Sequence, residues 1–453
     1  MHKIKRLIDK SKISEIQFLL ALLFSLFAFI FSRSFVGLIF FGFRLGEIIM
    51  LFSSLSYIYF TFTKTNSNFL FTRLKYINFL LLSIFVTNLY ISESSVLSTY
   101  TYKTSTYMWS IGFLTIGIFG KKFKLNKVTF VLSIFVIINL YLTSIYGFPT
   151  WIQEFFLEYS DKYEPHKAAD IVLILIIFST YFKIYLKNNF KFFSIQSIVF
   201  SLFLPLLLYK SRASFIALFL YGIYFLFSHL SKIKSNSSKS LLLLLACLIV
   251  TTFSTIVSQR LIIEEFSVEE IGNSYIQLSQ YKFETYVEEN SLLYINNNRL
   301  FSADGNLNWR LQMWQDQIIF TIDDGNMLTG LGYKNVLKVF TVETPSESCD
   351  LNDDGSCGNN RRGLDGLNEN LHNFFITLFA RGGLLTLLVF IYLFYFLLKN
   401  VNKVLFYDLL FLLLSILFVS SFDSSMENAH FPLILYLFIG NHFFNNNLKS
   451  QVH

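Results

Sequence analysis

Long runs of apolar residues recur along this 453-residue chain, separated by short polar stretches. A helix needs about 20 mainly apolar residues to cross the hydrocarbon core of a bilayer, because each residue rises only about 1.5 Å. The runs therefore predict an all-α membrane protein with about 12 transmembrane helices. The predicted helices are 14–32, 45–63, 75–92, 104–120, 127–146, 169–186, 192–208, 213–229, 240–257, 373–397, 404–422 and 431–445.

The basic residues between these runs predict the orientation. Cytoplasmic loops of membrane proteins are enriched in Lys and Arg, and stretches such as "GKKFKLNK" and "SKIKSNSSK" fall in every second loop. The intervening short loops hold few basic residues, namely Arg33, Arg44, Lys103, Lys162, Lys167, Lys210 and Arg212. We therefore expect both termini to be cytoplasmic.

One long polar segment, 258–370, interrupts the alternation of apolar runs and short loops, and it lies on the outer side. It contains 18 acidic and 8 basic residues, whereas the whole chain has a net charge of +7. Loops longer than about 15 residues are usually functional. We therefore divide the chain into helices one to nine (1–257), a large, partly helical periplasmic loop domain (258–370) and helices ten to twelve (371–453).

Composition supports the membrane assignment and excludes a nucleic-acid partner. The chain is 53% hydrophobic and only 15% charged, whereas a soluble domain has about 25% charged residues. A positive net charge indicates nucleic acid when it gathers on one soluble face. Here it is spread over the cytoplasmic loops.

The stretch "YKSRASF" places Lys210, Ser211 and Arg212 in a short outer hairpin, on the side where topology disfavours cations. Two interpretations stay open. The cations extend from a helix end toward water, or they form a clamp for phosphate, whose oxygens Arg binds in a bidentate manner.

In the loop domain, "NWRLQMWQDQ" places Arg310 and Trp314 four residues apart, on one face of a helix. This is consistent with a solvated helix carrying a cation–π pair. Further along, "LTGLGYKNV" contains Gly330 and Gly332, a tight loop whose spacing matches no established phosphate-binding motif.

His372 and Asn373 open the predicted helix 373–397. An interfacial His is often a hydrogen-bonded structural residue. A neutral imidazole at this position can also accept a proton from a hydroxyl nucleophile near neutral pH. His430, near the outer end of another helix, is the alternative base.

Two further motifs of the long polar segment predict structural features, a calcium loop and a disulfide. In "CDLNDDGSC", Asp350, Asn352 and Asp354 fit the first half of a calcium loop, although Arg361 stands where the twelfth-position acid is expected. Cys349 and Cys357 flank this hairpin and are expected to form a disulfide in an oxidising compartment.

In "EPHKAAD", Lys167 and Asp170 lie at the outer mouth of a helix. A solvated rim is the default interpretation of these two residues, and a polar cavity lined by both is the other.

In this order and topology, the motifs are similar to those of the O-antigen ligase and O-antigen polymerase superfamily of bacterial polytopic membrane glycosyltransferases. The residues that carry the resemblance are Ser211-Arg212, Arg310 with Trp314, Gly330-Leu331-Gly332, and His372-Asn373 followed by Gly382-Gly383. Arg381 departs from the pattern, since relatives often have an acidic or neutral residue before the glycines.

The resemblance implies an inner-membrane enzyme that takes a glycan from undecaprenyl pyrophosphate without a required cofactor. Arg212, Arg310 and Lys210 would stabilise the departing pyrophosphate, and His372 would be the base. Asn373, Ser211, Trp314 and Gly332 would support them. The resemblance leaves open whether the acceptor is another lipid-linked glycan (polymerase), lipid A-core (ligase) or a protein, and whether a chain-length regulator takes part.

A transporter or flippase is the alternative from another class. Transporters carry ionisable residues near the bilayer midplane and interrupted helices in repeated halves. The predicted helices carry few charges, such as Glu47, Lys183 and Asp408, and these lie near helix ends. The pattern therefore favours an enzyme, and polymerase over ligase, because a polymerase needs no docking site for a second kind of molecule.

Overall fold

The computed structural model describes most of the chain. The described residues are 2–63, 69–92, 101, 104–161, 163–186, 189–230, 249, 251–262, 293–296, 299–302, 305–324, 326–333, 337–338, 367–368 and 371–445. Among these residues the secondary structure is mostly helical, which confirms the expected class of fold.

Within the described residues, eight helices are long and apolar enough to cross a membrane. They are α1 (His2–Val36), α2 (Leu45–Thr63), α3 (Phe69–Ile91), α7 (Lys127–Tyr146), α9 (Ala168–Tyr185), α10 (Asn189–Lys210), α15 (Phe374–Asn400), and η1 (Lys403–Leu405) with α16 (Phe406–Ser420). Three apolar stretches are shorter: α5 (Thr106–Trp109) with α6 (Ile111–Phe119), the stretch Arg212–Ser228 of α11 (Arg212–Leu230), and α17 (His430–Ile439) with the π-helical η3 (Gly440–Phe444).

These elements coincide with all but one of the twelve predicted helices. The exception, 240–257, falls mostly outside the described residues, although a helix is described over 251–262 and extends past the predicted end. The total number of spans therefore stays a prediction.

Helix α9 lies in the interior of the bundle, whereas α1 and α3 lie at its edge. In α9, 78% of the most apolar window is buried, compared with 28% in α1 and in α3. A helix satisfies its own backbone hydrogen bonds, so an apolar helix is stable both among other helices and against lipid. The length of an apolar run therefore does not show whether a helix lies inside the bundle or at its edge.

Two spanning helices contain a non-helical residue. α1 is kinked at Ser32, with φ 49° and ψ −129°. α15 is broken at Gly383, with φ 71° and ψ −178°. A break frees backbone groups that other elements must satisfy, and both breaks lie close to the polar residues discussed below.

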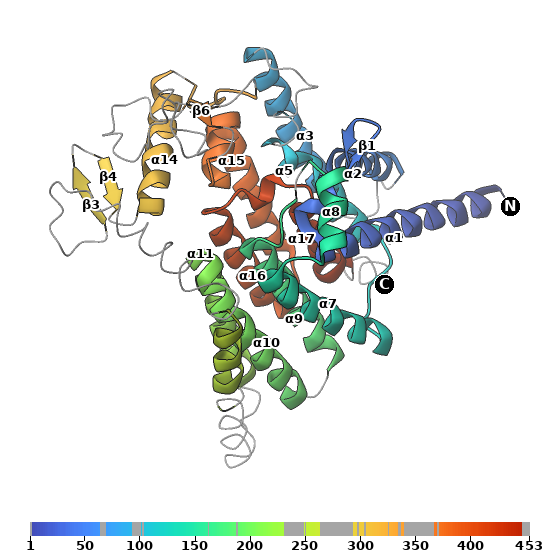
Figure 1. Ribbon diagram of the computed structural model, residues 1–453. Coiled ribbons are helices and arrows are strands. Elements are labelled where there is room, and N and C mark those ends of the chain that lie inside the picture. The colour runs from blue at the N-terminus through green and yellow to red at the C-terminus, as the bar shows by residue number, and fades with distance from the viewer. Residues whose placement is uncertain are drawn as a thin grey trace.

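The predicted loop domain contributes one well-described helix and short hairpins. α14 (Gly305–Asp323) packs on β4 and α15, and Figure 1 shows it beside α15 at one side of the bundle. The antiparallel pairs are β3 (Leu293–Asn296) with β4 (Arg299–Ser302), and β5 (Leu337–Lys338) with β6 (Leu367–Asn368). Sequence patterning missed two elements outside this domain, the β1 (Ile39–Phe40) and β2 (Phe43–Arg44) hairpin and helix α8 (Thr150–Tyr159).

Candidate functional site

α14 connects two loops of the membrane bundle through one of its faces. Arg310 Nη1 donates to the Phe422 carbonyl oxygen at 2.9 Å, beyond the end of α16. One turn later, the Trp314 ring lies 6.1 Å from the Phe422 ring. Trp314 Nε1 also donates to the Leu371 carbonyl oxygen at 2.6 Å. The expectation that Arg310 and Trp314 share a helix face is thus confirmed, and Trp314 holds the residue directly before His372.

His372 and Asn373 form the entrance to α15. The Asn373 Oδ1 atom caps the helix by accepting the backbone N–H groups of Phe375 and Ile376 at 3.0 and 3.1 Å. This is a common use of Asn at a helix N-cap. His372 is half-buried and has φ 49°, in the left-handed region that non-glycine residues rarely adopt. Trp314 and the Asn373 cap hold this strained residue from both sides.

The predicted tight loop of Gly330 and Gly332 fills the break in α15. The N–H groups of Leu331 and Gly332 donate to the Ala380 and Arg381 carbonyl oxygens at 2.7 and 3.0 Å. Beyond the break, the N–H group of Leu384 donates to the Met327 carbonyl oxygen at 2.9 Å. The amides of the loop therefore satisfy helix carbonyls in place of a phosphate.

Glycine is required on both sides of this contact. A Cβ on Gly330 would lie 2.5 Å from the Gly383 nitrogen, and a Cβ on Gly383 would lie 2.2 Å from the Leu328 oxygen. Both residues also have positive φ. Arg381, the departure noted in the sequence, is buried, and its Nη1 donates to the Gly332 carbonyl oxygen at 3.3 Å. A buried arginine thus reinforces the loop-to-helix contact.

Lys210, Ser211 and Arg212 lie where α10 ends and α11 begins. Lys210 Nζ is 3.4 Å from the His166 carbonyl oxygen, to which it donates. Ser211 Oγ accepts the Ser214 N–H group at 3.4 Å, in the first turn of α11. Arg212 is exposed. Of the two cations, Lys210 is therefore directed into the protein and Arg212 toward its surface.

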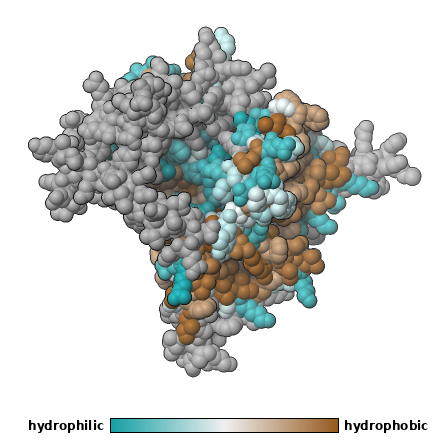
Figure 2. Space-filling model, in the orientation of Figure 1, coloured by the Kyte–Doolittle hydropathy of each residue, from teal (hydrophilic) through white to brown (hydrophobic). Residues whose placement is uncertain are grey.

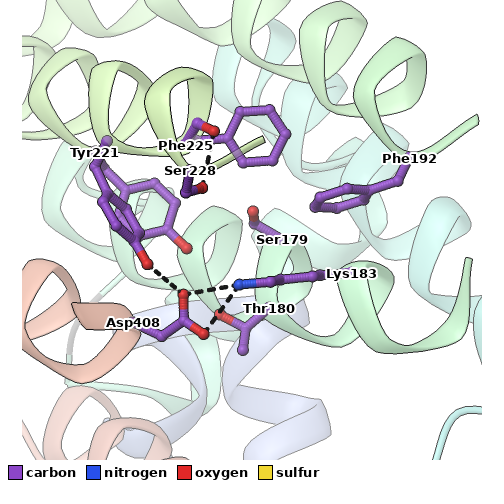
Figure 3. Close-up of a pocket in the computed structure, with 9 residues that line it drawn as sticks. Ser179, Thr180, Lys183, Phe192, Tyr221, Phe225, Ser228 and Asp408 are labelled. Carbon is purple, nitrogen blue, oxygen red and sulfur yellow. Dashed lines mark hydrogen bonds and ion pairs between the residues drawn. The ribbon is translucent and has the colours of Figure 1, made fainter. Parts of the chain in front are cut away.

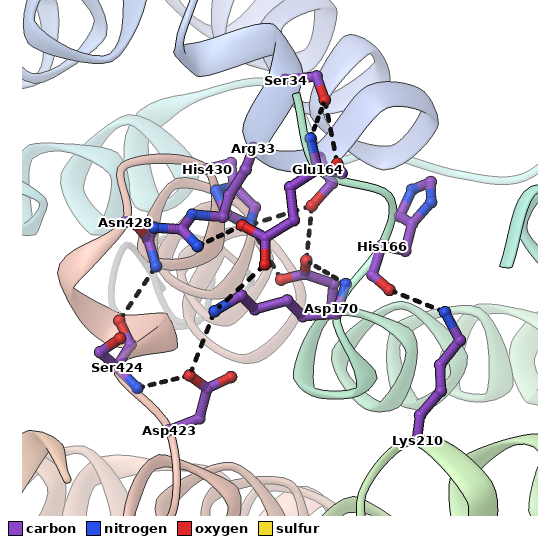
Figure 4. Close-up of polar contacts among 12 residues, drawn as sticks. Arg33, Ser34, Glu164, His166, Asp170, Lys210, Asp423, Ser424, Asn428 and His430 are labelled. Atoms are coloured by element: carbon purple, nitrogen blue, oxygen red, sulfur yellow. Dashed lines mark hydrogen bonds and ion pairs between the residues drawn. The ribbon is translucent and has the colours of Figure 1, made fainter. Parts of the chain in front are cut away.

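A network of charged residues joins the ends of several helices beside these groups (Figure 4). Glu164 pairs with Arg33 at the end of α1 and with Lys167 Nζ at 3.5 Å. Lys167 Nζ also lies 3.8 Å from Asp423 Oδ1. Asp423 follows Phe422, the residue that Arg310 contacts. We call this region, from Arg33 through Asp423 to His430, the polar end of the bundle.

Asp170 lies at the buried centre of the polar end. Its Oδ1 is 2.9 Å from His430 Nε2. Its Oδ2 accepts the Ser32 hydroxyl at 2.6 Å and the Lys167 backbone N–H group at 3.3 Å. One carboxylate thus joins the kink of α1, the first turn of α9 and the start of α17. Asp170 is only 4% exposed, so the expectation of a solvated rim is wrong for this residue, whereas Lys167 is half-buried.

His166 lies just before α9 and is buried. Its Nε2 is 2.9 Å from the Phe29 carbonyl oxygen. Burial lowers the pKa of His166 to about 4, although the nearby Asp170 charge acts in the opposite direction. The imidazole is therefore neutral at neutral pH, in its packed position between α1 and α9.

An ion pair occupies the opposite end of α9. Lys183 Nζ contacts both Asp408 carboxylate oxygens at 2.9 and 3.0 Å, and the Tyr224 hydroxyl donates to Oδ1 at 2.5 Å. Figure 3 shows these groups at a small pocket between α9, α10, α11 and α16. The pair lies at helix ends, away from the middle of the span where transporters carry their ionisable residues.

The structure brings some predicted site residues together and leaves others apart. Arg310, Trp314, His372 and Asn373 gather around α14, and Lys210 joins the polar end through His166. Cys349, Cys357, Asp350, Asn352 and Asp354 lie outside the described residues. Within the part of the chain that the structure describes, no group of three or more His, Cys, Asp or Glu residues could hold a metal ion.

Sequence reasoning missed the Asp170–His430–Ser32 junction. Asp170 and His430 were each noted at helix mouths, but they are 260 residues apart. The available signal was an acidic residue, Asp170, in the first turn of an otherwise apolar helix.

Fold and site together define a multi-pass membrane protein with a cation-containing polar face at one end of its bundle. Residues 197–391 match the family described as O-antigen ligase. This match covers less than half of the 453-residue chain and supports a relation to the O-antigen ligase and polymerase superfamily. The matched range contains Ser211-Arg212, Arg310 with Trp314, the Gly330–Gly332 loop, His372-Asn373 and Gly382-Gly383. No curated protein and no solved structure matches the chain significantly.

Proposed function

We propose that this protein is an inner-membrane glycosyltransferase of surface polysaccharide synthesis that acts as an O-antigen polymerase. It transfers a glycan from undecaprenyl pyrophosphate to a hydroxyl of a second lipid-linked glycan on the periplasmic face. The observation that carries this proposal is the double contact of α14, in which Arg310 reaches Phe422 and Trp314 holds the residue before His372. A cation and a titratable base are thereby positioned by one helix.

The proposed reaction needs charge stabilisation at the donor and a base at the acceptor. The acceptor oxygen attacks the anomeric carbon of the donor sugar, and the bond from that carbon to the phosphate oxygen breaks. Its electron pair leaves with the lipid pyrophosphate, and Arg310, Arg212 and Lys210 stabilise the added negative charge. The acceptor proton passes to His372.

Other residues of the site would act by support. Asn373 and Trp314 hold the backbone on either side of His372, Ser211 lies between the two cations of the α10–α11 hairpin, and Gly332 closes the break in α15. The calcium loop and the Cys349–Cys357 disulfide remain proposals for structural staples of the periplasmic loop.

The ligase function is the second candidate, because the matching family is described as O-antigen ligase. A ligase would use the same donor and the same cations but transfer the glycan to lipid A-core. The two functions differ only in the acceptor, so one assay with two acceptors separates them.

The test uses the full chain reconstituted in lipid with an undecaprenyl-pyrophosphate-linked repeat unit, read on a glycan gel. A ladder of longer lipid-linked chains is expected with this single substrate. His372→Ala should abolish the ladder, whereas Arg44→Ala should leave it intact because Arg44 pairs with Asp161 at the surface. A product that forms only after lipid A-core is added would overturn the polymerase in favour of the ligase. A ladder that survives His372→Ala would remove His372 as the base.

A further inference from the structure

The surface of helix α8 includes an exposed aromatic strip, an exposed acidic strip and a buried side. Trp151, Phe155 and Tyr159 follow one another at four-residue spacing and are exposed. The Phe155 and Tyr159 rings lie 5.2 Å apart. Glu154 and Glu158 form a parallel exposed row, and Phe156 faces the protein. Since residues four apart share a helix face, an aromatic strip and an acidic strip run side by side along the outer surface of α8.

The tip of the β1–β2 hairpin carries a second group of exposed aromatic residues next to α8. Phe41 is fully exposed, and Phe40 and Phe43 are exposed beside it. The hairpin is tied to the end of α8 by a bridge between Leu38 and Ser160. The ion pair of Arg44 Nε with Asp161 Oδ2, at 2.7 Å, adds a second tie.

Both elements lie at the ends of spanning helices. The hairpin joins the end of α1 to the start of α2, and α8 lies between the end of α7 and the start of α9. These four helices are all long and apolar enough to span. In Figure 2, hydrophobic residues cover the flank of the bundle, and hydrophilic residues gather in the middle of the face where Figure 1 places α8. An element at the end of a spanning helix is expected to lie near the boundary between lipid and water.

We propose that α8 and the β1–β2 tip form an interfacial anchor whose partner is the lipid surface. The strip of Trp151, Phe155 and Tyr159 enters the boundary between headgroups and acyl chains, and Glu154 and Glu158 face water. Aromatic residues with one apolar and one polar side prefer this depth. An amphipathic helix that lies in the membrane plane buries its apolar face by roughly 5–10 Å.

The anchor sets the depth of the polar end. Ser160 Oγ, directly after α8, donates to the Ser34 carbonyl oxygen at 2.9 Å, and Ser34 Oγ donates to the Glu164 carbonyl oxygen at 3.0 Å. Arg33, Glu164 and Lys167 are therefore held near the level of α8, where lipid phosphates lie. This placement concerns membrane depth and is tested without any assay of glycan transfer.

The test measures the depth of Trp151 by fluorescence quenching in vesicles of phosphatidylcholine brominated at carbons 6 and 7 or at carbons 11 and 12. The signal of Trp151 is the difference between the native protein and Trp151→Phe, since the chain has four tryptophans. We expect quenching by the shallow bromines to exceed that by the deep bromines, because insertion by roughly 5–10 Å leaves the ring near the headgroup boundary.

A matched control places the probe on the acidic strip. In the Trp151→Phe background, Glu154→Trp should respond to aqueous acrylamide and little to either brominated lipid. The anchor is overturned if Trp151 responds to acrylamide as strongly as Glu154→Trp does. It is also overturned by stronger deep quenching, or by a Trp151 that neither reagent reaches, since the strip would then be covered by protein.

Discussion

Asp170 combines deep burial with a negative charge, and its neighbours explain how the fold tolerates this. Removing a carboxylate from water costs several kcal/mol unless its oxygens are hydrogen-bonded. His430 contacts one oxygen, and Ser32 and the Lys167 backbone contact the other. At the residue scale, Asp170 is thus a junction among three helices.

Asp170→Ala is expected to lower the free energy of unfolding by about 3–5 kcal/mol, because it leaves His430 and Ser32 buried without their shared partner. Thermal unfolding in detergent measures the loss. Asp161→Ala, which removes a surface ion pair with Arg44, should cost about 1 kcal/mol or less. Equal destabilisation by the two variants would contradict the junction.

Arg310 has a predicted role that depends on the shape of its guanidinium. One Nη atom donates to the Phe422 carbonyl oxygen, and the planar guanidinium is suited to binding two phosphate oxygens at once, which a lysine ammonium cannot do in the same geometry. Arg310→Ala should reduce the initial rate of glycan transfer by about 100-fold or more, as for other lost donors of charge stabilisation. Arg310→Lys should recover only part of this rate. Full activity of Arg310→Lys in the same assay would reduce the role to that of a point charge.

At the element scale, the break in α15 and the 326–332 loop form one unit. The loop donates to carbonyls before the break and accepts from amides after it, so a broken spanning helix keeps its backbone hydrogen bonds satisfied. The contact also joins the loop after α14 to α15, and thereby holds Trp314 against the entrance of that helix.

Gly383→Ala and Gly330→Ala should each prevent stable folding or sharply reduce it, because the new Cβ would overlap backbone atoms and both residues have positive φ. The measurement is the yield of monodisperse protein and its melting temperature. Gly222→Ala is the matched control, since its Cβ would meet only Phe200 side-chain atoms at 3.4 Å or more. Ala in a helix interior even stabilises by about 0.5–1 kcal/mol. A fold that accepts Gly383→Ala would exclude the tight backbone contact.

At the scale of the whole molecule, the polar end gathers the ends of α1, α9, α10 and α17, and Arg310 of α14 contacts Phe422, the residue before Asp423. Its charges are largely balanced, because Glu164, Asp170 and Asp423 lie among Arg33, Lys167 and Lys210. The cations of the proposed pyrophosphate site therefore lie at the edge of a network of ion pairs. These ion pairs hold the cations in place, and the acidic residues do not neutralise all of them.

The stability of this assembly should depend on pH through His166. Its pKa is lowered from 6.5 to about 4 in the folded protein, so the unfolded chain binds a proton first. The contribution of neutral His166 to the free energy of unfolding is complete above about pH 6.5. It falls as the pH drops toward 4, by about 3 kcal/mol at most. His166→Gln should flatten the melting temperature between pH 6.5 and 4 relative to the native protein. The same slope in both proteins would show that His166 is not its cause.

The lengths of the apolar runs predicted where the helices lie. Spacing within one helix predicted some contacts of the site, but contacts between distant helices could not be predicted. Arg310 and Trp314 were placed on one face because they are four residues apart, and a helix of any environment preserves that relation. His430 and Asp170 meet only when α17 packs against α9, and no local pattern encodes that contact. α8 was missed because its apolar residues form a strip too short to cross a membrane.

The sequence by itself determined that the chain is helical and spans a membrane, and its motifs indicated the family, because run length and short-range spacing act within a single element. Only the tertiary structure decided which charges are buried and paired, that the Gly330 loop completes the break in α15, and that α14 joins Arg310 to the entrance of His372. These features depend on which helices pack together, and packing in lipid follows close contact and hydrogen bonding rather than hydrophobicity.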